Sequence, residues 1–188
     1  MTDKLELTIS SETITFFRQQ AEQKIKTEGW AKQGRNADVK RKNFVRCWVT
    51  EEAFKQLLIK ENKWFRNRGL YFGDAAGAGA DFVVKIAGKE VSIGIRSITR
   101  DSLTKWKSVA YPDDRFQQER EKIADYHVAC YEENGRVSFL GIISKEELLA
   151  ELEKSKRKYS PLNQEYFRVI PLEKFSDELL LELLKILK

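Results

Sequence analysis

Residues 81–98 have the sequence DFVVKIAGKEVSIGIRSI, which predicts two β-strands joined by a tight turn. Apolar and polar side chains alternate on both sides of the turn, so each strand would bury one face. A loop at Gly88-Lys89 would place Asp81 opposite Arg96. The predicted apolar face consists of Phe82, Val84, Ile86, Val91, Ile93 and Ile95, and the predicted polar face consists of Asp81, Lys85, Ser92, Gly94 and Arg96.

The segments on either side of this hairpin add helices and more strands. We expect a strand over 5–9, helices over 11–28 and 44–61, a helix between Pro112 and residue 124, a hairpin over 126–143, a helix over 145–158, a strand over 166–170 and a helix after Ser176. Asn134-Gly135 is the turn signal of the second hairpin. This order predicts an α/β or α+β sandwich, in which helices flank a mixed central β-sheet.

Length and composition are typical of one globular domain. The chain has 188 residues, of which 41% are hydrophobic and 34% charged, and neither a repeat nor a Pro/Ser-rich linker divides it. We divide this domain into a basic helical extension over 1–43, a core over 44–150, and a C-terminal strand and helix over 151–188. The sequence has neither a secretory signal nor an apolar run of the roughly 18 residues that a membrane span needs. Two cysteines without metal-ligand spacing complete the expectation of a reduced, cytoplasmic protein.

Positive charge is concentrated in the first part of the chain. The net charge is +5, but residues 1–70 carry 15 basic and 9 acidic side chains, whereas the remainder carries 19 and 20. We predict that this segment contacts DNA phosphates, although a solvated helical face would have the same charge. The predicted contact residues are Lys24, Lys32, Arg35, Lys40, Arg41, Lys42 and Arg46.

Asp81 and Arg96 are the candidate site residues of the first hairpin. A carboxylate opposite a guanidinium at the end of a buried hairpin, after the Gly-rich loop 71–80, is suited to handling a phosphate group. The alternative is a cross-strand ion pair that adds a modest increment of stability. The geometry of the hairpin alone leaves both interpretations open.

The sequence GADFVVKIAGKEVSIGIRS over residues 79–97 resembles the core hairpin of the PD-(D/E)XK, or restriction-endonuclease-like, nucleases. In that family an Asp begins one strand, and (D/E)-x-K follows a tight turn on the next strand, ahead of a helix. Asp81 matches the Asp, Gly94 falls where the second acid should be, and Arg96 falls where the Lys should be. The resemblance extends over residues 44–150 and implies a restriction-endonuclease-like core.

The segment TEEAF over residues 50–54 is similar to the Glu-x-Ala-Phe start of the first core helix in that family. This similarity makes Glu51 the counterpart of a metal-contacting Glu. A helix unbroken from Phe44 would point the Glu51 carboxylate inward. A helix that begins at Thr50 would instead make Glu51 an ordinary first-turn acid, favoured by the helix dipole.

The resemblance implies a Mg²⁺- or Mn²⁺-dependent endonuclease that hydrolyses DNA and cuts duplexes as a homodimer. Asp81, Glu51 and, as a relocated acid, Glu121 would bind the metal, with Glu119 as the alternative to Glu121, and Arg96 would contact the scissile phosphate. Gly94 offers no metal ligand and Arg96 is a poor general base, which favours an inactive module that binds nucleic acid or a protein partner. A third interpretation is an unrelated α/β domain in which Asp81 and Arg96 form only an ion pair.

Overall fold

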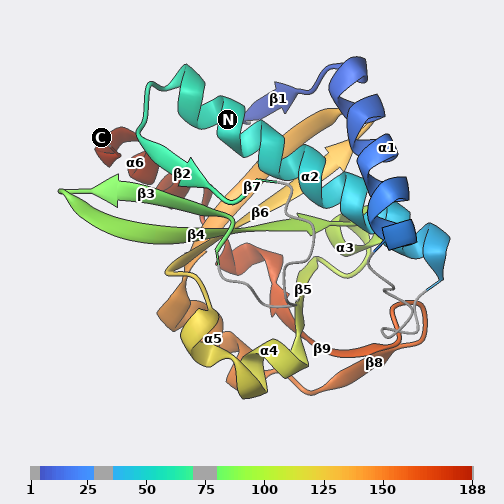
Figure 1. Cartoon of the computed structure of the whole chain (residues 1–188). Helices are drawn as coiled ribbons and strands as arrows, with labels where there is room; N and C mark the ends of the chain where they lie inside the picture. The colour runs from blue at the N-terminus through green and yellow to red at the C-terminus, as the bar shows by residue number, and fades with distance from the viewer. Residues whose placement is uncertain (1–4, 28–35, 70–79, 188) are drawn as a thin grey trace.

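A mixed β-sheet lies at the centre of the computed structural model, which describes residues 5–27, 36–69 and 80–187 (Figure 1). The strands described in it are β1 (Glu6–Thr8), β2 (Phe65–Asn67), β3 (Phe82–Ile86), β4 (Lys89–Ile98), β6 (Tyr126–Glu133) and β7 (Arg136–Ser144). Their order across the sheet is β1-β7-β6-β4-β3-β2. Strands β4 and β6 run parallel, and the other neighbouring pairs are antiparallel.

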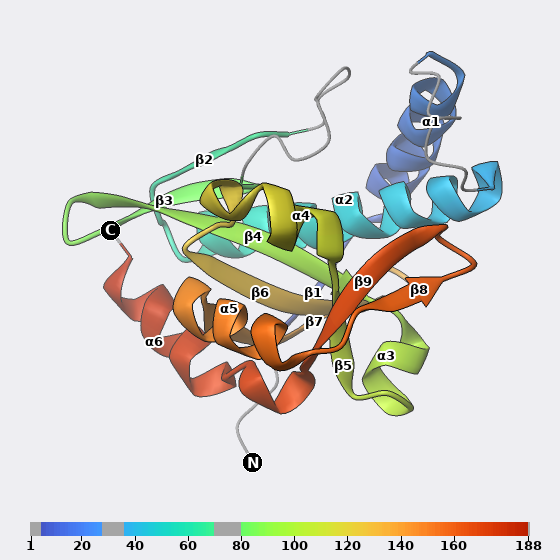
Figure 2. The ribbon, with the colours of Figure 1, turned by 90° about the horizontal axis from the view of Figure 1, so that it is seen from below.

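Helices cover both faces of this sheet. They are α1 (Ser11–Thr27), α2 (Ala37–Lys60), α3 (Arg100–Thr104), α4 (Asp113–Gln118), α5 (Lys145–Lys154) and α6 (Asp177–Ile186), with 3₁₀ turns η2 (Arg120–Lys122) and η3 (Leu172–Lys174). Figures 1 and 2 show α1 and α2 on one side of the sheet and α4 and α5 on the other. The structure therefore confirms the predicted mixed α and β class, with helices flanking a mixed sheet. In the described part of the chain, no helix combines the length and the apolar composition that crossing a bilayer requires.

Two hydrophobic cores lie on opposite faces of the sheet. Successive residues of β6 alternate between them: Val128 and Cys130 belong to the core that includes α1 and α2, and Ala129 belongs to the core that includes α5. A strand buried on both faces has a nearly continuous apolar sequence, which is the pattern of β6. The first core also contains Ile9 and Leu184, so it draws on residues from both ends of the described chain.

A smaller antiparallel sheet packs against the second core, in the order β5 (Ser108–Pro112), β9 (Glu165–Pro171), β8 (Lys158–Ser160). Strand β5 lies in a segment where we predicted loop and helix. Pro112 is the last residue of β5, where a missing N–H is tolerated, and Val109 and Tyr111 alternate into the core. The predicted helix over 145–158 ends at Lys154, because the chain turns there to form β8.

The first hairpin has the predicted faces but a different register. Phe82 pairs with Ile93, and Ala87 and Gly88, at φ 48° and 80°, form a two-residue turn. This turn lies one residue earlier than the predicted loop, which shifts the pairing by two positions and leaves each side chain on its predicted face. The ladder ends at Phe82 and Ile93, and the N–H of Asp81 donates to the carbonyl of Ile93 at 3.1 Å, so the prediction that Asp81 faces Arg96 is wrong.

Replacing Ala87 by asparagine is expected to raise the free energy of unfolding by about 0.5–1 kcal/mol. Ala87 has a positive φ, at which alanine is strained, and asparagine tolerates this backbone region better than other residues with a Cβ. Urea denaturation of both proteins measures the difference. The opposite change serves as the matched control, since Asn134 has φ 53° at the same position of the β6–β7 turn. Asn134→Ala should lose a similar amount, and a gain there would contradict the explanation.

Helix α2 is one continuous helix that carries Glu51. Asn36 caps its start, with the side-chain oxygen accepting a hydrogen bond from the N–H of Asp38 at 2.7 Å. Thr50 is buried in the middle of the helix, and its hydroxyl donates to the carbonyl of Cys47 at 2.8 Å. The alternative in which a helix begins at Thr50 is therefore wrong. The helix also runs without a break across the boundary that we drew between residues 43 and 44.

Candidate functional site

The Asp81 carboxylate lies at the end of the paired part of the β3–β4 hairpin. Its Oδ2 accepts a hydrogen bond from the N–H of Ile95 at 2.7 Å, just beyond the last pair of the ladder. The guanidinium of Arg68 lies 3.6 Å from its Oδ1, and 17% of the Asp81 side chain is exposed. The carboxylate is thus held in place while part of it remains accessible from solvent.

The charge of Asp81 affects Glu51 of α2, although the two residues are far apart in the sequence. Burial raises the pKa of Glu51 well above its usual range, and the negative charge of Asp81 raises it further. The positive charges of Arg68 and Lys24 act in the opposite direction. A carboxyl group whose pKa is raised by burial and by the charge of a second carboxylate is of a kind that is concentrated at functional sites.

Arg96 lies on the polar face of β4, near the same carboxylates. Its Nε donates to Nδ1 of His127 on β6 at 3.3 Å, and its guanidinium carbon lies 4.4 Å from the ring centroid of Tyr111 on β5. Burial lowers the pKa of Arg115 of α4, and the positive charge of Arg96 lowers it further. Sequence reasoning missed the contacts of Arg96 with Tyr111 and His127, because two separate strands bring these rings to it.

Gly94 occupies the position where the resemblance places the second acid. It is aligned with His127 on the neighbouring parallel strand, and a Cβ on residue 94 would lie 2.7 Å from Nδ1 of that imidazole. Real Cβ atoms do not come so close to other atoms, and the His127 side chain is buried and cannot easily move away. The imidazole therefore fills the space that a carboxylate at residue 94 would need.

Asp81 and Glu51 are the candidate metal ligands whose charges affect each other. Within the described ranges, no group of three or more His, Cys, Asp or Glu side chains could hold a metal ion. Mg²⁺ is nevertheless often bound by one or two carboxylates together with water and a substrate phosphate, so this pair fits it. Glu121 is exposed on η2, whereas Glu119 forms an ion pair with Arg115 at 3.8 Å.

The basic residues predicted to contact DNA differ in burial and in their polar partners. Lys24 and Lys40 are buried, Arg41 forms ion pairs with Glu22 and Asp38, and Arg46 donates to Asn43 at 2.8 Å. Lys42 is exposed, and Lys32 and Arg35 lie outside the described residues. Of the described members of this set, Lys42 is therefore the side chain best placed to reach a phosphate.

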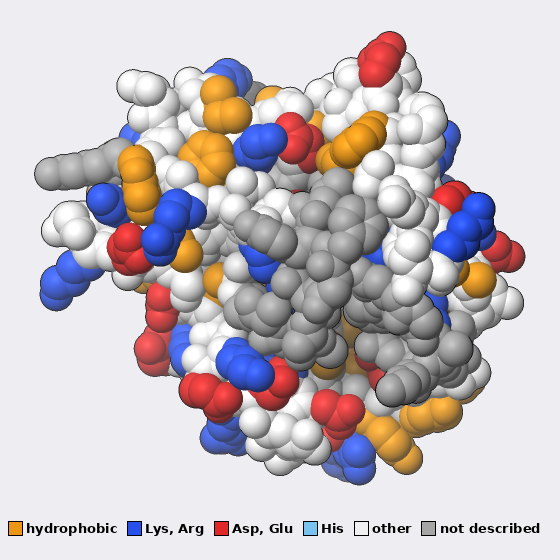
Figure 3. Space-filling model, viewed as in Figure 1, with side chains coloured by type: hydrophobic (Ala, Val, Ile, Leu, Met, Phe, Trp, Pro, Cys, Tyr) orange, Lys and Arg blue, Asp and Glu red, His pale blue; other side chains and the backbone are white. Residues whose placement is uncertain are grey.

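A second basic surface lies around β2 and the β3–β4 hairpin. The Nζ of Lys85 lies 4.2 Å from the ring centroid of the exposed Trp64, and Arg66 packs near the same ring and pairs with Glu90 at 2.8 Å. Figure 3 shows Lys and Arg side chains next to hydrophobic ones at this end of the molecule. A basic side chain on an exposed aromatic ring is a combination suited to nucleic acid, with phosphates and bases as the contacts.

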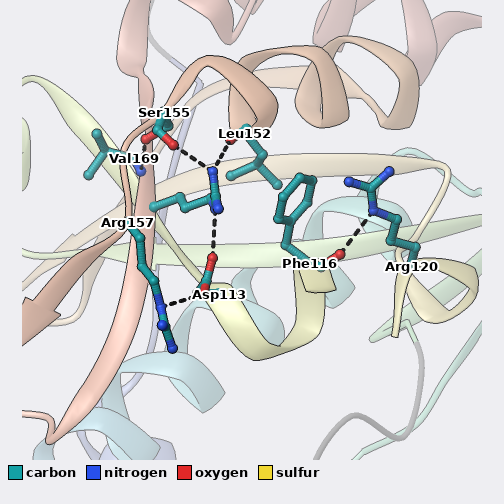
Figure 4. A network of polar contacts seen from close by, with 8 residues as sticks. Asp113, Phe116, Arg120, Leu152, Ser155, Arg157 and Val169 are labelled. Carbon is teal, nitrogen blue, oxygen red and sulfur yellow. Dashed lines mark hydrogen bonds and ion pairs between the residues drawn. The ribbon is translucent and has the colours of Figure 1, made fainter. Parts of the chain in front are cut away.

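A buried ion network fixes α4, the helix that carries Arg115 (Figure 4). The Asp113 carboxylate accepts from Nε of Arg168 at 2.6 Å and from Nε of Arg157 at 2.8 Å. Arg168 also donates to the carbonyl of Ser155 at 2.6 Å, which connects α4 and β9 to the end of α5. This network lies beside the site and has the structural task of holding α4 in place.

Comparison of the sequence with known protein families and with curated proteins finds no match. The function of the site is therefore inferred from its own residues, namely Asp81 with Arg68 beside it, Arg96 of β4, and Glu51 of α2, whose pKa the charge of Asp81 raises.

Proposed function

We propose that this chain is a Mg²⁺-dependent nuclease that hydrolyses DNA phosphodiesters and has a restriction-endonuclease-like core. The observation that carries the proposal is the Asp81 carboxylate, which the N–H of Ile95 holds at 2.7 Å with Arg68 at 3.6 Å, on the hairpin that also carries Arg96. Carboxylates suit a divalent cation, and arginines suit the phosphate oxygens of the substrate. The resemblance of residues 79–97 to a nuclease hairpin agrees with this chemistry.

Each residue has a separate task in the proposed reaction. Asp81 and Glu51 would hold Mg²⁺, which when bound supplies an activated water and neutralises negative charge on the phosphate. Arg96 would bind a non-bridging oxygen of the scissile phosphate and stabilise the charge that develops on it. Arginine stays protonated at neutral pH and cannot accept the proton of the attacking water, so Arg96 acts as an electrostatic group. Lys42 and the surface around Trp64 would contact the DNA backbone on either side.

The test is cleavage of supercoiled plasmid in Mg²⁺ or Mn²⁺ by the wild type, Asp81→Asn and Glu51→Gln. We expect nicking by the wild type and a loss of about 100-fold or more in each variant, because each removes a charged metal ligand. Glu52→Gln is the matched control: Glu52 is the next residue of α2 and pairs with Lys55 at 3.2 Å. Cleavage that persists at the wild-type rate in both site variants would contradict the assignment.

A second candidate function is a nucleic-acid-binding module that does not cut. It is favoured by Gly94 and His127, since the imidazole leaves no space for a second acid on β4. The same experiment separates the two functions. Intact plasmid in every metal, together with binding that weakens steeply as salt rises, would support the second candidate. The homodimer that cutting of duplex DNA implies is tested by sedimentation with and without DNA.

A further inference from the structure

A cavity of about 590 Å³ lies between α1, α2 and the ends of β4 and β6. Strands β4 and β6 are parallel, so the carboxyl ends of both strands are at this edge of the sheet. Ligands commonly bind beyond the carboxyl ends of parallel strands, where the segments that leave the sheet form a crevice. The walls of the cavity include Ile14 and Arg18 of α1, Val45 and Arg46 of α2, Arg100 of α3 and Tyr131 of β6.

Three arginines from three different helices line this cavity. Arg18 is exposed and has no polar partner among the described residues. Arg46 donates from Nη2 to Asn43 at 2.8 Å, whereas its Nε and Nη1 have no partner in the described part of the chain. Arg100 lies 3.8 Å from Glu133 and its side chain is 78% exposed, so this ion pair is weak. Most of the hydrogen-bonding capacity of the three guanidinium groups is therefore unused.

The two carboxylates in the lining do not neutralise the three arginines. Oε1 of Glu132 accepts a hydrogen bond from the N–H of Gly135 at 2.8 Å, and Glu133 is the weak partner of Arg100. Three arginines and two glutamates give the lining a net charge of +1. The cavity therefore favours an anion, and the planar guanidinium matches the oxygens of a phosphate group with two parallel hydrogen bonds.

Another part of the lining is apolar. Ile14 and Val45 are half-buried and pack against the first core, and the buried Val49 and Ile98 also line the cavity. The half-buried ring of Tyr131 packs against the second core and offers an aromatic surface on which a flat group can stack. Small-molecule sites have volumes of roughly 300–1,000 Å³, so inorganic phosphate alone would leave most of this cavity unfilled.

We propose that this cavity is a binding site for a nucleoside monophosphate, with the phosphate on the three arginines and the base against Tyr131 and the apolar wall. An organic phosphate with an aromatic part matches both kinds of lining, whereas a free phosphate or a free nucleoside matches only one. The site is independent of the proposed nuclease reaction, because none of the residues that line it has a task in that reaction.

The first experiment is isothermal titration calorimetry of the full chain with the 5′-monophosphates of adenosine, guanosine, cytidine and uridine. We expect at least one of these nucleotides to bind. The matching nucleoside and inorganic phosphate should each bind at least about tenfold more weakly, because each lacks one of the two parts that the cavity contacts. At equal concentration, the nucleotide should also raise the midpoint of thermal unfolding more than the nucleoside or phosphate does, since a ligand stabilises the folded chain according to its affinity.

The second experiment repeats the titration with variants of the lining. Arg18→Gln and Arg46→Gln are each expected to weaken nucleotide binding about tenfold, because each removes a charged contact to the phosphate. Arg120→Gln is the matched control and should change the affinity less than about twofold, since Arg120 lies on η2, outside the cavity, and pairs with Glu153 at 3.3 Å. Tyr131→Leu removes the ring and should weaken binding, whereas Tyr131→Phe keeps the ring and should bind as the wild type does.

The outcomes separate a nucleotide site from a simple anion site and from a DNA contact. Binding that weakens in Arg46→Gln and Tyr131→Leu, in chains that unfold at the wild-type temperature without ligand, would support the nucleotide site. No binding of any of the four nucleotides, or binding that no lining variant weakens, would overturn it and leave the plasmid-cleavage test unaffected. Equal affinity for nucleotide and inorganic phosphate would reduce the cavity to an anion site and overturn the nucleotide assignment. Weaker binding of duplex DNA by Arg18→Gln and Arg46→Gln, without any nucleotide binding, would make the cavity a DNA contact and also overturn the proposal.

Discussion

Asp113→Ala is expected to lower the free energy of unfolding by about 3–5 kcal/mol, the effect of removing one partner from a buried ion pair. The Asp113 carboxylate is 3% exposed and accepts from Nε of Arg168 at 2.6 Å and from Nε of Arg157 at 2.8 Å. Without it, Arg168 keeps the carbonyls of Leu152 and Ser155 as partners but has no counter-charge in a buried position. Urea denaturation at neutral pH measures the loss.

Asp114→Ala is the matched control, because Asp114 is the next residue of α4 and its side chain is exposed. It should change the free energy of unfolding by less than about 0.5 kcal/mol. The double variant Asp113→Leu with Arg168→Met removes both charges and should recover part of the loss, since apolar pairs can replace buried ion pairs. A loss below about 1 kcal/mol in Asp113→Ala would show that the network is dispensable.

Glu51→Gln is expected to stabilise the metal-free chain by about 1–3 kcal/mol at pH 8, in the range of the penalty for burying an uncompensated polar group. Burial and the charge of Asp81 raise the pKa of Glu51 in the folded state, so the folded chain binds its proton more tightly than the unfolded chain does. Stability then falls as pH rises through this range. Below the unfolded pKa both states are protonated, so the gain from glutamine should vanish near pH 4.

Unfolding curves at several pH values between 4 and 8 test this expectation. Glu52→Gln, one residue further along α2, is the control: Glu52 is paired with Lys55 and Gln56, and its substitution should give no gain at any pH. If Glu51→Gln proves less stable than the wild type at pH 8, the carboxylate stabilises the fold and is not held there at a cost to stability. A stabilised variant that has also lost cleavage would indicate that Glu51 is kept for function.

Several parts of the fold could be predicted from the sequence because they depend on neighbours in the chain. The apolar and polar faces of the first hairpin are correct, since alternation follows from the pleat of a strand. Asn134 and Gly135 have φ 53° and 82° in the second turn, as expected for this residue pair. Ser144 and Ser176 cap α5 and α6, with their hydroxyls accepting from N–H groups three residues later.

The candidate site could be predicted from the sequence only in part. Asp81 and Glu51 could be chosen from the sequence by the resemblance of their segments to a nuclease family, and the charge of Asp81 raises the pKa of Glu51. The register of the hairpin could not be predicted from the sequence, because Ala87 adopts a positive φ that its side chain does not favour. Strand β5 could not be predicted either, since the burial of Tyr111 depends on its pairing with β9.

The sequence by itself determined most of the elements and the faces of the first hairpin, because backbone preferences, capping and alternation act within a few residues. The tertiary structure decided which side chains meet. The parallel pairing of β4 with β6 brings His127 beside Gly94, and the packing of β5 brings Tyr111 to Arg96. These contacts join residues that are distant in the chain, so they form and stabilise the fold only when the whole core has packed.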